Sequence, residues 1–376
     1  MPDHIQGIFQ TETGNQDRRP GVWMDGVAYL DPERVAFTAV LSKLPSKPVT
    51  DPTFKLFERE HRTRWVRAAE AMDASETGLD VAASEVFRVG DIILMDDERM
   101  YVSALASATS LTVVRGYVGS TAATHNDNAW IKILFQKQTE HGSSGTPIQT
   151  DYTTQENHVQ IFKEAYGESN TSKATKRRGP SQLSEERARV LERLRRDQEQ
   201  MVVWGKKRIE RSSGVITRYS GGLDEFVSTN RIDLEGALEL GDIGYIINQS
   251  TRFGSSKKLW FVGRDALYQL SSLGLDFVQI DQATSVLGMS VKRVRGPHGE
   301  FSLIEHRDFE NAHGGRIMIV DPRHVALAVL RKMKHEANIQ DNDTDGVKHQ
   351  FIGEMGLWLD TEKAHTICYN AGGEVF

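Results

Sequence analysis

The sequence predicts an α+β protein in which a small β-barrel-like module interrupts a larger mixed domain. Residues 181–211 carry apolar side chains at helical spacing, which predicts one long helix. Residues 79–134 are short β-rich runs separated by turn-type residues, the pattern of a small sheet or barrel. Residues 215–335 alternate between the two patterns, so helices and strands share the rest of the fold.

The N-terminal segment, residues 1–36, repeats at neither helical nor strand period. Its apolar residues, Trp23 among them, are isolated between polar ones. Two interpretations remain open: a floppy terminus, or an extended arm that docks on a neighbouring subunit through those side chains. Three prolines in residues 45–52 then exclude a regular helix, and residues 54–72 are predicted to form an extended, charged ribbon.

The predicted module occupies only about fifty-five residues, so it is a compact insertion into something larger. Residues 136–180 are polar, with a flexible Gly-Ser-Ser-Gly hinge at 142–145. The basic cluster 173–178 has no interleaved aromatic residues, which favours a solvated loop over a nucleic-acid patch.

The long helix is the clearest element. Ser181 is placed to cap its N-terminus, and Glu185 and Glu186 lie near the positive end of its dipole. Gly214 is predicted to end it. A coiled coil and a helix lying across a sheet both suit its narrow apolar stripe. The stripe consists of Leu183, Val190, Leu191, Leu194, Met201, Val202 and Ile209.

The remaining elements are predicted by local pattern. We expect helices at 234–249 and 264–272, strands at 258–262, 286–294, 301–305 and 316–320, and a short element at 324–330. The runs 348–359 and 364–369 are predicted to pair as a terminal hairpin.

Composition excludes several function classes. The formal net charge is -6 and the pI about 6.1, whereas proteins that grip DNA usually carry a positive field. The longest apolar runs fall short of the ~20 residues that span a bilayer, so no membrane partner is expected. The single cysteine, Cys368, cannot form an internal disulfide, which fits assembly in a reducing cytosol.

Motifs for catalysis are missing from the sequence. It has no Walker loop, nucleophile elbow or zinc-helix motif. His298, His306 and His313 lie close enough in sequence for a metal site, although surface polar residues are the favoured interpretation. Residues 341–346 resemble the start of a calcium loop but lack the glutamate at position twelve. We therefore expect no catalytic, cofactor-binding or metal-binding residues, and no enzyme activity.

Four separated phrases together resemble one family, the major capsid proteins of tailed bacteriophages. The first joins Val113-Val114-Arg115-Gly116-Tyr117 to Gly119–His125, and the second is Asn157-His158-Val159-Gln160-Ile161-Phe162. The third is Arg196-Asp197-Gln198-Glu199 with Gly205, and the fourth joins His349–Glu354 to Lys363-Ala364-His365. Their order and spacing agree with the family from about residue 35 to the end.

The resemblance implies the tailed-phage and herpesvirus major capsid fold (HK97-type), shared with encapsulins, carrying the β-barrel-like insertion in its E loop. The implied parts are an N-terminal arm (1–36), the start of the peripheral domain and the E loop (37–78), the inserted module (79–134), the return of the E loop (135–180), the spine helix (181–214), the axial domain (215–325) and the return to the peripheral domain (326–376).

The resemblance also implies the function. The chain is expected to self-assemble into hexamers and pentamers of an icosahedral head that encloses double-stranded DNA without specific binding. It would be assembled in the host cytoplasm and reside in the virion capsid. Because the chain starts at Met1 with no long heptad run, we expect a separate scaffolding protein, besides portal and decoration proteins. Expected inter-subunit contacts are Trp23, Arg59, Arg62, Trp65, Arg67, Arg196 and Glu199.

Three other interpretations remain open. An encapsulin-like compartment would share the fold, although the inserted module argues against it and a neighbouring portal gene would decide. A phage tail or adhesion protein could carry the Arg115-Gly116-Tyr117 phrase, but would lack the long helix. An enzyme using the His298–His313 cluster would contain bound metal.

Overall fold

The computed structural model describes residues 36–59, 62–140, 152–175, 181–273, 281–286, 289–296 and 299–371. The chain divides into two compact units, one of residues 57–155 and one that combines residues 1–56 with 156–376. Apart from Ala36, the predicted arm lies outside the described residues, and so does Trp23. Within the described residues, no helix is both long enough and apolar enough to cross a membrane.

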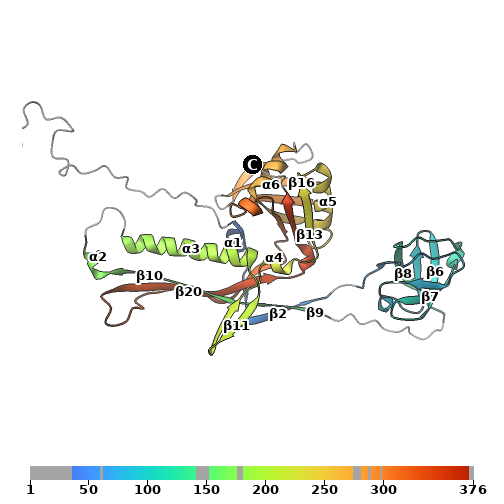
Figure 1. Cartoon of the computed structure of the whole chain (residues 1–376), viewed down its shortest axis with the longest axis horizontal. Coiled ribbons are helices and arrows are strands. Elements are labelled where there is room, and N and C mark those ends of the chain that lie inside the picture. The colour runs from blue at the N-terminus through green and yellow to red at the C-terminus, as the bar shows by residue number, and fades with distance from the viewer. Residues whose placement is uncertain are drawn as a thin grey trace, which may run out of the picture. The chain divides into compact units, whose positions relative to one another are not determined.

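In the larger unit, a long helix lies along a four-stranded sheet (Figure 1). The helix is α3 (Gln182–Trp204). The sheet has the order β1-β19-β20-β10, and only the β1–β19 pair is parallel. Its strands are β1 (Lys47–Pro48), β10 (Gln160–Ser169), β19 (Val325–Glu336) and β20 (Gly346–Leu359), and the short helix α2 (Asn170–Ala174) follows β10.

The start of α3 and six of the seven predicted stripe residues confirm the sequence prediction, whereas the seventh, Ile209, lies beyond the end of the helix. The Ser181 side chain accepts a hydrogen bond from the backbone N–H of Ser184, as an N-cap does. Val190, Leu194 and Met201 are 0%, 3% and 5% exposed, because they face Phe162, Tyr166, Phe351 and Met355 of the sheet.

The predicted end of this helix is wrong: α3 stops at Trp204, not at residue 211. A side chain at Gly205 would collide with the carbonyl oxygens of Met201 and Ser220, so the chain must turn where a glycine allows close approach. A hairpin follows, formed by β11 (Arg208–Ser212) and β12 (Val215–Tyr219). Ser213 and Gly214, at φ 50° and 82°, form its tight turn, so Gly214 turns the hairpin and does not end the helix.

Leu194→Ala is expected to reduce the free energy of unfolding by about 2–5 kcal/mol, because it leaves a cavity between α3 and the sheet. Arg196→Ala, two residues along the same helix, should leave stability within about 0.5 kcal/mol, because its ion pair is exposed. Urea unfolding of both variants measures the difference. Equal midpoints would contradict the assignment of Leu194 to the buried stripe.

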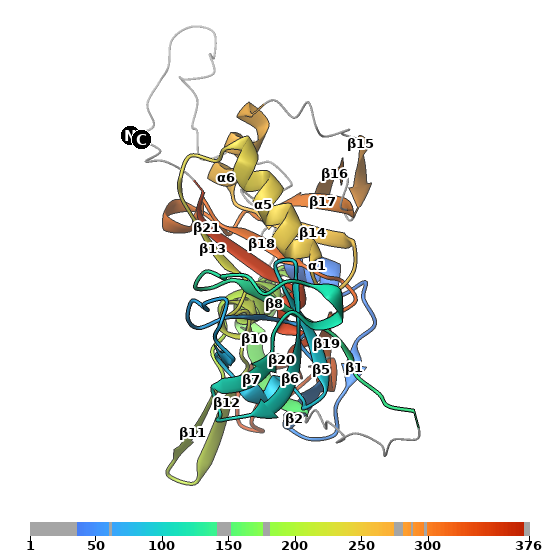
Figure 2. The same ribbon diagram turned by 90° about the vertical axis from the view of Figure 1, so that its right-hand side faces the viewer.

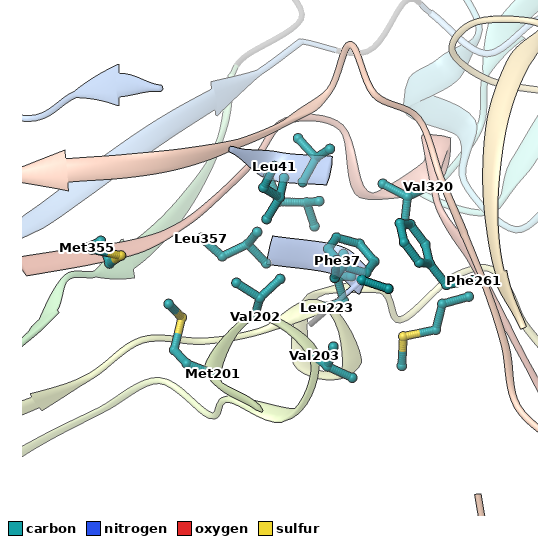
Figure 3. Close-up of a cluster of buried hydrophobic side chains, with 14 of the residues drawn as sticks. Phe37, Leu41, Met201, Val202, Val203, Leu223, Phe261, Val320, Met355 and Leu357 are labelled. Carbon is teal, nitrogen blue, oxygen red and sulfur yellow. The ribbon is translucent and has the colours of Figure 1, made fainter. Parts of the chain in front are cut away.

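A second layer of the core forms around the short helix α1 (Ala36–Leu41) (Figure 3). Phe37 stacks on Phe261 with ring centroids 4.0 Å apart. Leu41 belongs to the same buried cluster, together with Val202 of α3 and Leu223 of α4 (Leu223–Phe226). The segment that directly follows the predicted arm is thus part of the core.

The larger unit also contains a seven-stranded mixed sheet of order β13-β21-β18-β14-β17-β16-β15. Two helices, α5 (Leu240–Thr251) and α6 (Arg264–Ser272), lie beside it (Figure 2). Ile246, Ala266 and Leu270 of these helices join Trp260 and Ile319 of the sheet in one buried cluster. The strands are β13 (Arg231–Gly236), β14 (Lys257–Val262), β15 (Asp281–Val286), β16 (Met289–Gly296), β17 (Gly299–Glu305), β18 (Ile317–Val320) and β21 (Thr366–Ala371).

Several predicted elements here are confirmed, and others are corrected. Strands β14, β17 and β18 and helix α6 fall where the pattern predicted them. The helix predicted at 234–249 begins only at Leu240, because β13 runs to Gly236. The strand predicted at 286–294 is part of a hairpin of β15 and β16. The short element at 324–330 is the first half of the long strand β19.

The predicted terminal hairpin is wrong. β20 pairs with β10 and β19, whereas β21 lies between β13 and β18 in the other sheet. Thr361, at φ 52°, helps redirect the chain between them. The side chains of β21 are mostly buried, which a strand inside a covered sheet requires and a surface hairpin does not. The chain end therefore ties the two sheets together.

The smaller unit contains a six-stranded sheet of order β3-β8-β5-β6-β7-β4. An isolated bridge between Ala68 and Val81 links its two outer strands, which closes the sheet toward a barrel. Its interior includes Ile93, Met95, Met100 and Ile131, all 0% exposed. The strands are β3 (Trp65–Arg67), β4 (Gly78–Asp80), β5 (Asp91–Met95), β6 (Glu98–Leu105), β7 (Ser110–Val114) and β8 (Trp130–Gln136).

This sheet extends beyond the predicted range 79–134 at both ends. Residues 65–67, predicted to belong to the charged ribbon, pair with β8 instead, because Val66 packs on the barrel interior while Trp65 and Arg67 point outward. The ribbon that does form is two-stranded, made of β2 (Thr53–Glu58) and β9 (Thr153–His158).

Candidate assembly surfaces

Two of the predicted contact residues are arginines with different surroundings. Arg59 is exposed, and its guanidinium carbon lies 5.9 Å from the centroid of the Tyr152 ring. Arg62 forms an ion pair with the buried Asp91 and donates a 2.8 Å hydrogen bond to the Val86 carbonyl oxygen. Arg62 is therefore held by its own subunit, and Arg59 is the more accessible of the two.

Trp65 and Arg67 lie on the outer surface of the barrel. The Trp65 ring is 50% exposed and meets the equally exposed Trp130 ring edge to face, with centroids 6.3 Å apart. The Arg67 guanidinium lies 4.4 Å from the Trp130 centroid, and the Lys132 ammonium lies 5.0 Å from the Trp65 centroid. Tryptophan and arginine are enriched among the residues that dominate binding energy at interfaces, so the exposure of this surface is compatible with the predicted contact.

The two predicted contact residues on α3, Arg196 and Glu199, differ in their exposure to solvent. Arg196 lies on the accessible side of the helix and pairs with Glu192, one turn earlier, at 2.8 Å. Glu199 is 1% exposed, so the prediction that it faces solvent or a neighbouring subunit is wrong. The reason is its position three residues before Val202, on the buried side of the helix.

Glu199 instead fixes the start of α1. Its carboxylate accepts hydrogen bonds from the backbone N–H groups of Phe37 (2.7 Å) and Thr38 (2.6 Å), and from the Thr38 hydroxyl. His306, which is 0% exposed, lies 2.7 Å from the same carboxylate through Nε2. We call Glu199, Phe37, Thr38 and His306 the α1 clamp. It joins three segments that are more than one hundred residues apart.

Asn157, from the second family-like phrase, has a similar connecting role that the sequence did not reveal. It is 1% exposed, and its amide nitrogen donates to the carbonyl oxygens of Gly221 (3.1 Å) and Leu357 (2.7 Å). Its Oδ1 accepts from the backbone N–H of Gly221 at 2.8 Å. The phrase is the only signal in the sequence for these contacts, because Gly221 and Leu357 are distant along the chain.

In the barrel, the first family-like phrase surrounds the buried carboxylate of Glu98. Arg115 donates to both Glu98 oxygens at 2.8 Å, and the backbone N–H groups of Gly116 and Ala123 donate at 2.9 and 3.0 Å. His125 Nε2 lies 3.0 Å from the same carboxylate. Burial alone would raise the pKa of Glu98, but these hydrogen bonds outweigh it and lower the pKa to about 2. The phrase thus serves local folding of the module.

This low pKa predicts acid sensitivity of the barrel. An unfolded glutamate titrates near 4.5, so the Glu98 contribution to stability is present above that pH and is lost as the pH falls toward 2. We expect Glu98→Gln to be destabilised at pH 7 and to lose less further stability on acidification than the unmodified chain. Amide hydrogen exchange in residues 98–125 between pH 6 and 3 measures this. Parallel pH dependences in the two proteins would refute it.

The seven-stranded sheet contains a buried ion pair. Lys258 Nζ lies 3.1 Å from Asp321 Oδ2, and both side chains are 0% exposed. Lys258 also donates to the carbonyl oxygens of Phe253 (3.0 Å) and Ala364 (2.8 Å). Hydrogen bonds to the Asp321 carboxylate, from the backbone N–H groups of Ser255 and Arg323 and from Lys258, overcome its burial and lower its pKa to about 2. The pair ties the loop before β14 to the segment before β21.

Two of the three candidate metal-binding histidines lie in the described residues, and they have different partners. His306 belongs to the α1 clamp, His313 packs on the Trp204 ring at 4.6 Å between centroids, and His298 lies outside the described residues. In the described part of the chain, which includes the calcium-like loop at 341–346, no group of three or more His, Cys, Asp or Glu side chains could hold a metal ion.

Comparison with solved structures shows which fold the chain has. The capsid of a native GTA particle aligns over 95% of this chain and 97% of its own, with a TM-score of 0.51 at 7% identity. A protein of Microbacterium phage Oxtober96 aligns over 95% and 93%, with a TM-score of 0.47 and 13% identity. The holo-SrpI encapsulin of Synechococcus elongatus covers 60% of this chain and 81% of its own, with a TM-score of 0.44 and 13% identity. The predicted α+β, HK97-type capsid fold is confirmed.

The family follows from the sequence. A family model described as SU10 major capsid protein matches residues 9–371, so the chain belongs to that family. No curated protein gives a significant match. The chain is a structural shell subunit of a phage head: it assembles with copies of itself and is located in the virion capsid.

Proposed function

We propose that the chain forms the hexamers and pentamers of an icosahedral head that encloses double-stranded DNA, and that it acts without a catalytic site of its own. The observation that carries this proposal is the family match over residues 9–371, together with a fold that spreads one chain over separate sheets, a ribbon and an inserted barrel. Such extended elements supply many heterologous contacts, which a closed shell requires. The net charge of -6 is compatible with a shell that encloses DNA without binding it tightly.

The proposal assigns a role to each segment. Helix α3 with its four-stranded sheet, and the return after residue 326, are the peripheral domain, and the seven-stranded sheet is the axial domain. Residues 1–36 are the arm, and the β2–β9 ribbon belongs to the E loop, which carries the barrel. Arg59, Arg62, Trp65, Arg67 and Arg196 are the proposed contacts to neighbouring subunits, together with Trp23 of the arm.

Further partners belong to the same proposal: a separate scaffolding protein, a portal and decoration proteins, with assembly in the host cytoplasm. Expression of the chain alone and with its neighbouring genes tests it. We expect closed shells by negative-stain electron microscopy and a fast-sedimenting species that contains this chain. Soluble monomers under every condition, or trimeric fibres, would contradict the proposal.

A further inference from the structure

One outer face of the barrel combines aromatic and basic side chains. Residues that pair across antiparallel strands share a face of the sheet. The register places Trp65 opposite Lys132 and Arg67 opposite Trp130, and then places Lys132 opposite Leu94 and Leu94 opposite Arg99. We call these six residues the barrel face: Trp65, Arg67, Leu94, Arg99, Trp130 and Lys132.

The barrel face contains three cations and no carboxylate. Within the described residues, Arg67, Arg99 and Lys132 form no ion pair with Asp or Glu. Arg67 and Lys132 lie over indole rings instead. An aromatic ring attracts a cation without neutralising its charge, so this face keeps its attraction for negative groups.

The loops at one end of the same sheet, after β3, between β5 and β6 and before β8, are acidic. Three loops meet there: the bridge between Met72 and His125 joins two of them, and the 2.7 Å contact of His125 Nδ1 with Asp96 adds the third. These loops carry Glu70, Asp97 and Asp127, which are exposed and form no ion pair within the described residues. We call these three residues the acidic end.

We propose that the barrel face of one copy docks on the acidic end of the barrel in a neighbouring copy, so that the barrels link subunits to one another. The inference rests on the proposed shell, which surrounds every barrel with further copies of itself. The basic barrel face and the acidic end are different patches of one unit, so a contact that pairs their opposite charges between two copies is heterologous. Tryptophan and arginine at its centre supply the residues that dominate association energies.

The geometry favours a protein partner over a nucleic acid. Stacking of bases needs open aromatic faces, but cations lie over both indoles and the two rings stand at 88° to each other. A carboxylate surface instead pairs with the cations directly and covers the half-exposed rings.

Zero-length carbodiimide cross-linking of shells built from equal amounts of unlabelled and ¹⁵N-labelled chain tests the proposal. Lys132 is the only lysine of the barrel face, so we expect it to be joined to a peptide containing Glu70, Asp97 or Asp127, with mixed isotope pairs that prove a link between copies. If shells form but Lys132 is joined to another protein, to other carboxylates or to nothing, the proposal is overturned while the shell function stands. If the unmodified chain forms no shell, the proposed function fails first.

Charge reversal identifies the partner independently and needs no reaction at Lys132. In the Arg67→Glu/Lys132→Glu variant, the fraction of shells that remains assembled after a salt challenge should fall about tenfold. The Asp97→Lys/Asp127→Lys variant should show the same loss. The combined four-residue variant should recover, because the opposite charges face each other again. An equal reversal on the hairpin of the other unit, Arg208→Glu/Arg211→Glu, is the matched control. Failure of the combined variant to recover would overturn the pairing.

Discussion

Replacing Glu199 by alanine is expected to cost about 3–5 kcal/mol of folding free energy, although this residue was predicted to face outward. The change leaves the N–H groups of Phe37 and Thr38 and the imidazole of His306 without their acceptor in a buried site. Each unpaired buried group costs about 1–3 kcal/mol. Release of the carboxylate's own desolvation penalty offsets only part of this.

The loss should begin locally. Loss of the α1 clamp leaves α1 with its apolar contacts to the described core, so amide exchange in residues 36–41 should accelerate before the rest of the unit opens. Glu192→Ala is the matched control, because Glu192 lies on the same helix and its pair with Arg196 is exposed. It should change stability by less than about 0.5 kcal/mol. Equal urea midpoints for the two variants would show that the clamp has no energetic role.

Lys258→Met is expected to be comparably severe, at about 3–5 kcal/mol, because it leaves the Asp321 carboxylate buried without its cation. The carbonyl oxygens of Phe253 and Ala364 lose a donor as well. Lys257→Met, on the exposed neighbouring position, should be nearly neutral. Thermal unfolding of the two variants provides the comparison.

A double variant separates the ion pair from simple packing. If the unpaired carboxylate causes the damage, Lys258→Met/Asp321→Asn should be more stable than Lys258→Met alone, since the amide carries no charge. The single variant should also recover stability at low pH, where Asp321 can be protonated, whereas the unmodified chain loses it there as the pH falls from about 3.8 toward 2. A double variant no better than the single one would contradict this account.

Local pattern predicted several elements correctly. The stripe of α3, helix α6 and most of the barrel strands follow from periodicity, because burial of one face fixes the spacing of apolar residues. Strand β14 follows instead from its short apolar run, which is buried on both faces. Local pattern did not predict the features that depend on a segment distant in the sequence. The helix ends just before Gly205, because the Ser220 carbonyl oxygen lies close to the Gly205 backbone. The residues next to Gly205 in the sequence give no sign of this contact.

The polar residues of the family-like phrases could not be interpreted from sequence for the same reason. Glu199 looks like one more charge on a charged helix, and only the folded chain brings Phe37 and His306 to it. Asn157 and Glu98 likewise bind groups from other strands and loops. The resemblance included Glu199, Asn157 and the Arg115 that binds Glu98, but not Glu98 itself, whereas the structure shows that these residues hold the subunit together. Trp65 is half-exposed and Arg67 is exposed on the barrel, as a contact surface requires, and their role as contacts between subunits stays a prediction.

The central claim is that copies of this one chain build a closed head. Single-particle electron microscopy of the assembled particles, at a resolution that traces α3, tests it most directly. The account predicts closed shells in which the same chain occupies rings of six and rings of five, with α3 and its four-stranded sheet intact in every copy. Particles built mainly of another protein, or rings of this chain with a single symmetry and no closed shell, would contradict it.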